Sequence, residues 1–446
     1  MILDAPLSPP RRLQCRGFEG YKTIDPSVQF VNAELEAKPN NFFVVLDANS
    51  QRLFWGQLIS QACDKLMSVG MIWVFTTHFS PHWIPWFIGL GAVPHFLLAS
   101  KSGHWISQWG ALRTVIGADV FRGILFILCA WLVTFVKADG QLLLLFLVSA
   151  FISNVAGALF NPAILSLPVD MLEPGEKRDK LTALIDSCFS LGNVIGPLLS
   201  ALTYAWAGLP GMLGVNGLSY FFSAALAIGI KLKTSNTILA EIDDSDATQS
   251  PVKAKPILEV LKNQPVISGM LFTFLLMNFF LAPVMIFMPW YAKTIYADGI
   301  SGLAKLEAFF GMGSVAGGFL LSFVKLPGAT WMRISASLSL MAVAYLSFTC
   351  SHNLWHGCFS LFLLGFFLSL ANVIILTLFQ SAPEAQDVPV VMGMVNLISV
   401  ASLPISMGIV GSFIEQVNVP NFAAICALIV IGLALSIRLI PGIQSV

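Results

Sequence analysis

Long apolar segments constrain the fold of this chain more than any other feature of its sequence. A helix needs about 20 mostly apolar residues to cross the hydrocarbon core of a bilayer. Twelve stretches of this kind can be counted, at 52–77, 82–100, 114–136, 141–167, 182–208, 214–232, 265–290, 303–324, 330–350, 354–380, 390–414 and 421–441. Runs such as QLLLLFLVSAFI at 141–152 do not show the polar–apolar alternation of a membrane β-barrel. The sequence therefore predicts an all-α membrane protein with 12 transmembrane helices.

Composition excludes several classes of protein. Charged residues make up 11% of the chain and the net charge is zero, whereas a soluble domain carries about 25% charged residues. A water-soluble enzyme, a disordered scaffold and a nucleic-acid-binding protein are therefore excluded. The sequence shows no GxxxxGKS or GxxxxGKT loop for nucleotide phosphates and no nucleophile–base arrangement. We expect no enzyme activity, no cofactor, no metal and no ATPase partner. The expected energy source is an ion gradient, with protons as the first candidate.

The distribution of Lys and Arg predicts the orientation in the membrane. With the N-terminus inside, nineteen of the 24 basic residues fall in cytoplasmic segments, and Lys137, Lys293 and Lys305 fall in external loops. Basic residues favour the cytoplasmic side of membrane helices. An even number of spans then puts both termini in the cytoplasm.

A long polar stretch divides the spans into two equal sets. We predict a cytoplasmic N-terminal extension at 1–51, a six-helix bundle at 52–232, a cytoplasmic linker at 233–264 and a second six-helix bundle at 265–446. Two such bundles joined by a linker indicate a parallel repeat with a substrate cavity between its halves. The run ILEVLKNQPV at 257–266 is typical of an amphipathic helix on the inner face of the membrane.

Several short motifs resemble those of a known transporter family. They are LISQACDKL at 58–66, ADVFRGILF at 118–126, FNPAILSL at 160–167 and LGNVIGPLLSAL at 191–202. In their order and spacing they resemble the major facilitator superfamily, and more narrowly the branch of the enterobactin exporter and the macrolide-efflux proteins. The resemblance implies two pseudo-symmetric bundles that move about a central substrate site by alternating access.

A polar stripe on the first span is the main candidate site. Gln57, Gln61, Asp64 and Ser68 are spaced four, three and four residues apart, so they lie on one face of a helix. Asp64 and Lys65 fall about 18 Å into this span, near the membrane midplane, where ionisable residues mark functional sites. We predict that the stripe lines a cavity and that Asp64 binds and releases a proton. The alternative is a structural Asp64 that pairs permanently with Lys65 or with another helix.

Other polar residues inside the spans complete the set of candidates for substrate contact. Besides Asp64, this set contains Lys65, Gln57, Gln61, Asn154, Asn278, Asn372 and Asn396. Asn side chains also join membrane helices through hydrogen bonds, so this second interpretation stays open for each of them. Glu307 is expected near the outer start of the eighth span, where its side chain can reach the membrane surface.

The resemblance also implies a gate on the cytoplasmic side. GHWISQWGALR at 103–113 fills the predicted turn between the second and third spans, with Gly103, Gly110 and Arg113 in the family's pattern. Ser107 and Gln108 stand where the family has Asp-Arg.

Further gate candidates lie in the third and fifth spans. Asp119 and Arg122 are three residues apart, which suits an ion pair within one helix. Asp186 either closes the same gate or reaches interfacial water. Gly192, Gly196 and Pro197 resemble the glycine pattern of antiporters, and they allow close helix packing and a kink.

Together these observations predict a secondary active transporter, a multi-pass protein of the bacterial inner membrane. The resemblance favours proton-coupled export of an amphipathic small molecule, siderophore-like or drug-like, with this substrate and the lipid bilayer as the expected partners. An importer of an iron–siderophore chelate or nutrient and a lysophospholipid transporter remain alternatives. From other classes, a membrane-embedded enzyme and a non-transporting sensor or scaffold are weighed against this interpretation.

Overall fold

The computed structural model describes residues 47–80, 83–172, 175–232, 262–324, 327–384, 387–414 and 416–445. Two predicted regions lie outside the described residues, namely the N-terminal extension up to residue 46 and the linker at 233–261. Residues 257–261 of the predicted amphipathic helix lie outside them as well. The boundaries predicted for the two bundles stay a prediction.

The described residues are almost entirely helical. They form α1 (Ala48–His78), α2 (Trp83–Trp109), α3 (Ala111–Val133), α4 (Asp139–Met171), α5 (Glu176–Ile228), α8 (Pro265–Leu281), α9 (Val284–Thr294), α10 (Gly299–Phe323), α11 (Thr330–Thr349), α12 (Leu354–Ser381), α13 (Val388–Phe413), α14 (Val419–Ser436) and the short 3-10 helices η1 (Ile437–Leu439) and η2 (Ile443–Ser445).

These helices account for the predicted membrane spans. Nine helices of the described residues are long and apolar enough to cross a membrane, counting α8 and α9 as one span, and the bent α2 makes ten. α5 holds two predicted spans, because Gly208 inside it has φ 60° and ψ −158° and breaks the helix. With α5 counted twice and α10 included, the described part of the chain holds the twelve predicted transmembrane helices.

The connection between α2 and α3 differs from the prediction. The sequence predicts a short turn at 101–113, but α2 continues through a bend of 70° as Lys101–Trp109. Only Gly110 makes the turn, with a φ of 86° that glycine adopts readily. Gly103 therefore lies inside a helical segment and forms no part of a tight turn. The reason is local, since the positive φ of Gly110 turns the chain from the end of α2 into α3.

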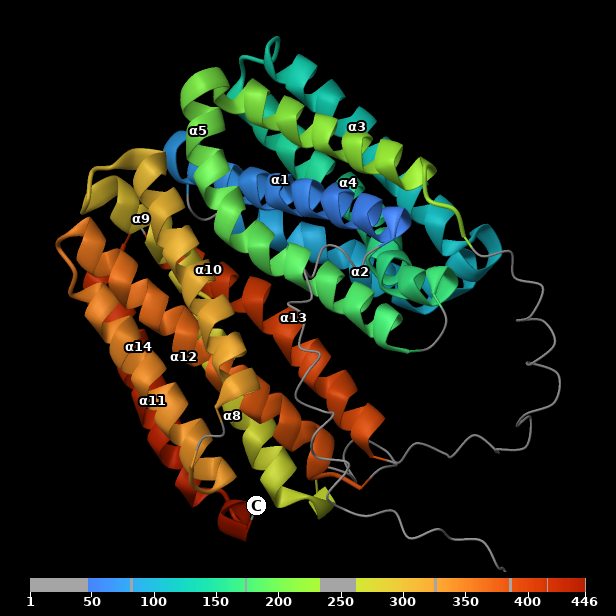
Figure 1. Cartoon of the computed structure of the whole chain (residues 1–446). Coiled ribbons are helices and arrows are strands. Elements are labelled where there is room, and N and C mark those ends of the chain that lie inside the picture. Colours follow the sequence, from blue (N-terminus) through green and yellow to red (C-terminus); the bar gives the residue numbers. More distant parts are fainter. Residues whose placement is uncertain are drawn as a thin grey trace, which may run out of the picture. The chain divides into compact units, whose positions relative to one another are not determined.

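The helices pack in two sets, which we call the first set (α1–α5) and the second set (α8–α14). α1 packs most extensively against α5, and α10 packs most extensively against α12. Figure 1 shows the first set in blue to green and the second set in yellow to red. Contacts between the two sets run from α5 to α10 and from α2 to α13.

Glycine permits the closest helix contacts inside each set. A Cβ added at Gly196 of α5 would lie 2.6 Å from the carbonyl oxygen of Ala62 on α1. A Cβ added at Gly313 of α10 would overlap the carbonyl oxygen of Phe362 on α12. Small residues at such positions let membrane helices approach closely, so these glycines fix how α1 and α12 lie.

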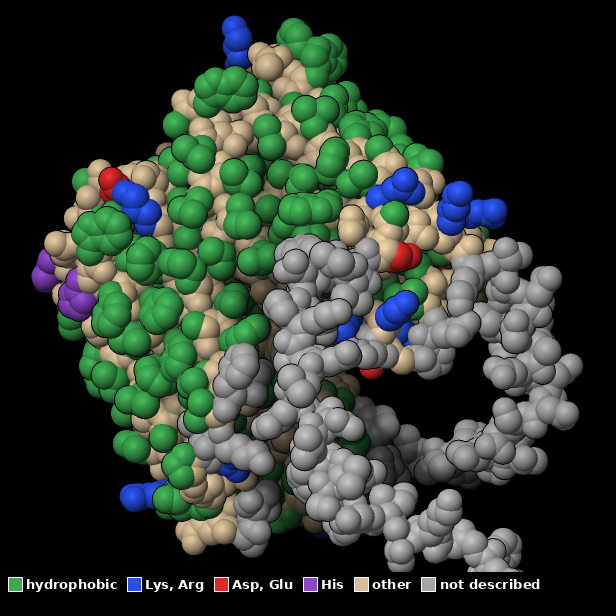
Figure 2. All heavy atoms as spheres, in the orientation of Figure 1, with side chains coloured by type: hydrophobic (Ala, Val, Ile, Leu, Met, Phe, Trp, Pro, Cys, Tyr) green, Lys and Arg blue, Asp and Glu red, His purple; other side chains and the backbone are tan. Residues whose placement is uncertain are grey.

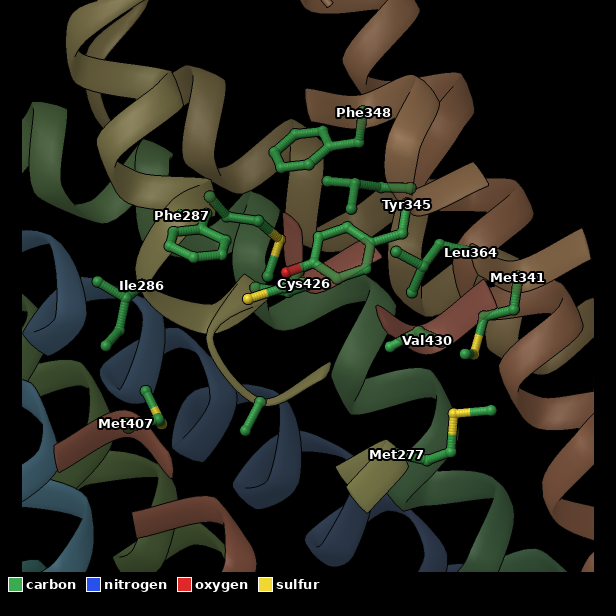
Figure 3. Packing of buried hydrophobic residues seen from close by; sticks show 14 of the residues in the cluster. Met277, Ile286, Phe287, Met341, Tyr345, Phe348, Leu364, Met407, Cys426 and Val430 are labelled. Carbon is green, nitrogen blue, oxygen red and sulfur yellow. The ribbon is translucent and has the colours of Figure 1, made fainter. Parts of the chain in front are cut away.

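Aromatic, aliphatic and sulfur-containing side chains fill the core of the second set. Phe287, Tyr345 and Phe348 are fully buried and belong to one cluster with Met341 and Cys426, part of which Figure 3 shows. The outward surface is also apolar, as Figure 2 shows for one face, with Lys and Arg near its margins. Such an extended apolar surface is expected where helices face lipid.

Candidate functional site

A polar cavity lies inside the first set of helices. Its volume is about 340 Å³. α1, α2, α3, α4 and the second part of α5 line it through Asp64, Met67, Ser68, Met71, Phe87, His95, Arg122, Phe126, Phe146, Ser149, Ala150, Ser153, Asn154, Gly157, Asn161, Asn216 and Tyr220. We call it the Asp64 cavity. Polar groups are concentrated in it, although the surrounding helices are apolar.

A cluster of charges lies at the wall of the Asp64 cavity. Arg122 donates to Asp119 at 2.6 Å, and its Nη1 lies 3.9 Å from Oδ2 of Asp64. Tyr220 donates a hydrogen bond from its hydroxyl to the carboxylate of Asp64. The predicted spacing of Asp119 and Arg122 therefore does form an ion pair within one helix.

Burial divides this cluster into an anchored part and a part that reaches the cavity. The side chain of Asp119 is fully buried and that of Arg122 is 7% exposed, whereas that of Asp64 is 30% exposed. The guanidinium carbon of Arg122 lies 4.2 Å from the ring centre of Phe160 and 4.3 Å from that of Tyr220. These contacts hold the arginine in place at the cavity wall, and of the two acids only Asp64 lines the cavity.

The polar stripe of α1 is only partly turned to this cavity. Asp64 and Ser68 line it. Gln57 is 1% exposed and its amide nitrogen lies 3.4 Å from Oγ of Ser223, so α5 covers this part of α1 and keeps Gln57 outside the cavity. Gln61 is half-buried beside the backbone of Gly192.

The asparagine candidates are spread over both sets. Asn154 lines the Asp64 cavity, where its side-chain oxygen lies 3.3 Å from Nε2 of His95. Asn278 donates to the carbonyl of Phe274 within its own helix at 2.8 Å. Asn372 is half-buried and Asn396 is exposed. The structure therefore brings Asn154 together with Asp64, and the other three asparagines do not line this cavity.

Lys65 takes no part in the Asp64 cluster. Its Nζ lies 2.9 Å from Oε2 of Glu307 on α10, so the ion pair joins the two sets of helices. The side chain of Glu307 is 2% exposed, and the expectation that it reaches the membrane surface is wrong. The permanent pair of Asp64 with Lys65 is also not formed, because adjacent residues on a helix point about 100° apart.

A second cavity surrounds this ion pair, and we call it the Lys65 cavity. Its volume is about 360 Å³, and α1, α5, α9, α10 and α12 contribute to it. Both sets of helices therefore build it. Its lining residues are Lys65, Ser190, Asn193, Met285, Glu307, Phe310, Gly311, Ser314, Val315 and Ser369.

The remaining gate candidates lie away from both cavities or serve packing. Asp186 is exposed on α5, and Arg113 is exposed at the start of α3. A Cβ added at Gly192 would lie 3.1 Å from the backbone of Gln61, so Gly192 and Gly196 together seat α1 on α5. Pro197 is buried inside α5 next to this contact. No gate at the predicted cytoplasmic side follows from these positions alone.

Tyr220 and Glu307 are two charged-site contacts that sequence reasoning missed or misplaced. Tyr220 is one of only six tyrosines in the chain and lies within an apolar span, where a buried hydroxyl needs a hydrogen-bond partner. That requirement could have linked it to Asp64. For Glu307, the signal was the acidic residue itself, since a carboxylate within a membrane span needs a partner.

Among the described residues, no three His, Cys, Asp or Glu side chains are placed to hold a metal ion.

Comparisons with known proteins agree with this architecture. Solved structures with a similar fold include a bacterial homologue of the human lysosomal transporter Spinster, inward-facing and unoccupied, with TM-score 0.59 and 13% identity over 89% of this chain and 96% of that chain. A peptide transporter, POT, in complex with sulfate has TM-score 0.66 and 12% identity over 89% and 95% of the two chains. The nucleoside transporter NupG has TM-score 0.62 and 12% identity over 89% and 100%.

Sequence comparison gives the family. Among curated proteins none matches the chain. Residues 53–407 match the family model described as Major Facilitator Superfamily. Since this match spans most of the helices that form the two sets, the protein belongs to the Major Facilitator Superfamily of membrane transporters.

Proposed function

We propose that the protein is a proton-coupled exporter of an amphipathic small molecule, drug-like or siderophore-like, that works by alternating access. The observation that carries the proposal is the unbalanced charge at the Asp64 cavity. The resemblance to the enterobactin-exporter and macrolide-efflux branch supports the substrate class, the outward direction and a place in the bacterial cytoplasmic membrane.

The charge balance of the cluster favours a bound proton. Two carboxylates, Asp64 and Asp119, face one guanidinium, Arg122, so the group carries one excess negative charge when both acids are ionised. An uncompensated charge away from water is costly. A proton on one carboxylate removes the excess, and Asp64 is the acid that the cavity reaches. Proton binding and release at Asp64 therefore changes the charge of a site deep in the membrane.

Contacts between the two sets support alternating access. Lys293 donates to the carbonyl of Thr76 at 3.0 Å, and a Cβ added at Gly408 would lie 3.8 Å from Cβ of Pro85. The sequence predicts that these residues lie at the external side. Sets that touch there and carry polar cavities at mid-depth fit a state closed to the outside.

The proposal is tested with the purified protein in liposomes that carry an imposed pH gradient. Ethidium, a macrolide and a catechol siderophore serve as candidate substrates. The variant Asp64→Asn is expected to lose gradient-driven flux but to keep substrate exchange without a gradient, because only the proton site is removed. Asp139→Asn, an exposed acid at the start of α4, is the matched control and should behave as wild type. Unchanged gradient-driven flux in Asp64→Asn would remove the proton role.

The direction of transport needs a separate measurement in cells. Cells without the protein are expected to retain more of the substrate than cells with it. Lower uptake in cells without the protein would instead favour an importer, for instance of an iron–siderophore chelate or a nutrient.

A further inference from the structure

The Lys65 cavity contains an ion pair that the proton site does not use. Lys65 belongs to the first set and Glu307 to the second, and their charged atoms are 2.9 Å apart. Glu307 is 2% exposed and Lys65 is 19% exposed. If the two sets move relative to each other during transport, this contact has to open and close.

Opening the ion pair leaves two opposite charges in a place of low polarity. An anion bound to Lys65 would leave Glu307 without a partner, and a cation bound to Glu307 would leave Lys65 without one. Each isolated charge is costly there. A molecule with one positive and one negative group satisfies both residues at once, and it leaves the net charge of the cavity at zero.

The rest of the cavity suits a small polar head attached to an apolar body. Its volume of about 360 Å³ is within the range of about 300–1,000 Å³ for small-molecule sites. Hydroxyl and amide groups are available for further hydrogen bonds from Ser190, Asn193, Ser314 and Ser369. Apolar surface is offered in the same cavity by Met285, Phe310 and Val315.

We propose that the Lys65 cavity binds a zwitterionic head group of the transported molecule. The ammonium group lies at Glu307, and a carboxylate or phosphate lies at Lys65. The inference rests on the proposed function, because it assigns a substrate class to the proposed transporter. It is independent of the proton site, since Asp64 lines a different cavity.

The test uses three fluorescent probes with the same body and different charges. Nε-dansyl-lysine carries an ammonium and a carboxylate, dansylcadaverine lacks the carboxylate, and dansyl-aminohexanoate lacks the ammonium. Binding to the protein in lipid vesicles is followed by dansyl fluorescence, with empty vesicles subtracted. The zwitterion is expected to bind at least about tenfold more tightly than either other probe, because only it leaves no buried charge unpaired.

Variants assign this preference to the two residues. In Lys65→Met, the cationic probe dansylcadaverine should bind at least as well as the zwitterion Nε-dansyl-lysine. In Glu307→Gln, the anionic probe dansyl-aminohexanoate should bind at least as well as the zwitterion. Lys65→Met combined with Glu307→Gln should bind all three probes alike. The exchanged pair, Lys65→Glu with Glu307→Lys, should keep the preference for the zwitterion, and it tests the proposal if a single variant fails to fold.

A second ion pair, at the start of α10, provides the control. Lys305 and Asp298 lie 2.8 Å apart and are each about one-third exposed, so Lys305→Met with Asp298→Asn should keep the wild-type order of probes. Equal binding of the three probes by the wild type, or tighter binding of a singly charged probe, would overturn the proposal. A preference for the zwitterion that survives in Lys65→Met and in Glu307→Gln would overturn it too. If the wild-type protein shows no pH-driven flux in these vesicles, the proton-coupled function is contradicted. The expected preference for the zwitterionic probe is not affected by that result.

Discussion

Asp64 and Lys65 are neighbours on α1, but their side chains face two different cavities. Asp64 accepts a hydrogen bond from Tyr220 and lines the cavity of the first set. Lys65 pairs with Glu307 in the cavity between the sets. One helical step therefore separates the proposed proton site from a charge contact between the two sets. A shift of α1 would act on both cavities, which gives the proposed proton coupling a physical route.

The ion pair between the sets should be asymmetric in its effect on stability. Lys65→Met leaves Glu307 buried and unpaired, which costs about 3–5 kcal/mol for a buried pair. Glu307→Gln should cost less, because Lys65 is partly exposed and its long side chain can reach water. The double neutral variant should be more stable than Lys65→Met alone. Thermal unfolding in lipid nanodiscs measures this order, and an equal loss from both single variants would contradict it.

Arg122 should not be replaceable by lysine. Its guanidinium pairs with Asp119 and lies over the rings of Phe160 and Tyr220, and lysine has no planar group for these contacts. We expect Arg122→Lys to lower stability by about 2 kcal/mol, the size of a desolvated cation–π contact, and to reduce gradient-driven flux. Arg438→Lys, at an exposed site, is the control in the same unfolding and flux assays. Wild-type flux in Arg122→Lys would show that a positive charge alone is sufficient.

A disulfide across the predicted external side should stop transport. A Cβ at position 408 would lie 3.8 Å from Cβ of Pro85, which is about the Cβ–Cβ distance of a disulfide. In a background without native cysteines, Pro85→Cys with Gly408→Cys should cross-link in the resting protein. The cross-link should block flux, and a reductant should restore it. Full flux with the cross-link in place would contradict alternating access through this contact.

Close packing of α1 on α5 should make one glycine intolerant of a methyl group. A Cβ at Gly196 would lie 2.6 Å from the backbone of α1, whereas nothing lies within 4 Å of a Cβ at Gly117. Overpacking of this kind costs about 1–3 kcal/mol. Gly196→Ala should therefore unfold at a lower temperature than wild type, and Gly117→Ala should not. Similar unfolding of the two variants would show that α1 can move away from α5 at low cost.

The membrane helices could be predicted because each needs a long apolar run, and such runs are directly visible in the sequence. The turn at Gly110 was harder. Lys101–Trp109 is polar and aromatic and follows an apolar span, which favours a loop, but the helix continues through Gly103 as far as Trp109. Composition therefore indicated the edge of the membrane and not the end of the helix.

The candidate site could be predicted only where its residues share one helix. Asp119 and Arg122 are three residues apart, so their ion pair follows from helical geometry. Tyr220 and Glu307 reach α1 from distant parts of the chain. Periodicity within α1 indicates that Asp64 and Lys65 point in different directions, but it does not say which helices they meet.

The central claim is that protons move opposite to the substrate through a site at Asp64. The most direct measurement records internal pH and substrate together in liposomes that contain the protein and a substrate gradient but no initial pH gradient. We predict that downhill substrate movement drives protons in the opposite direction, and that Asp64→Asn abolishes this proton movement. Substrate movement without proton movement in the wild type, or equal proton movement in Asp64→Asn, would contradict the account.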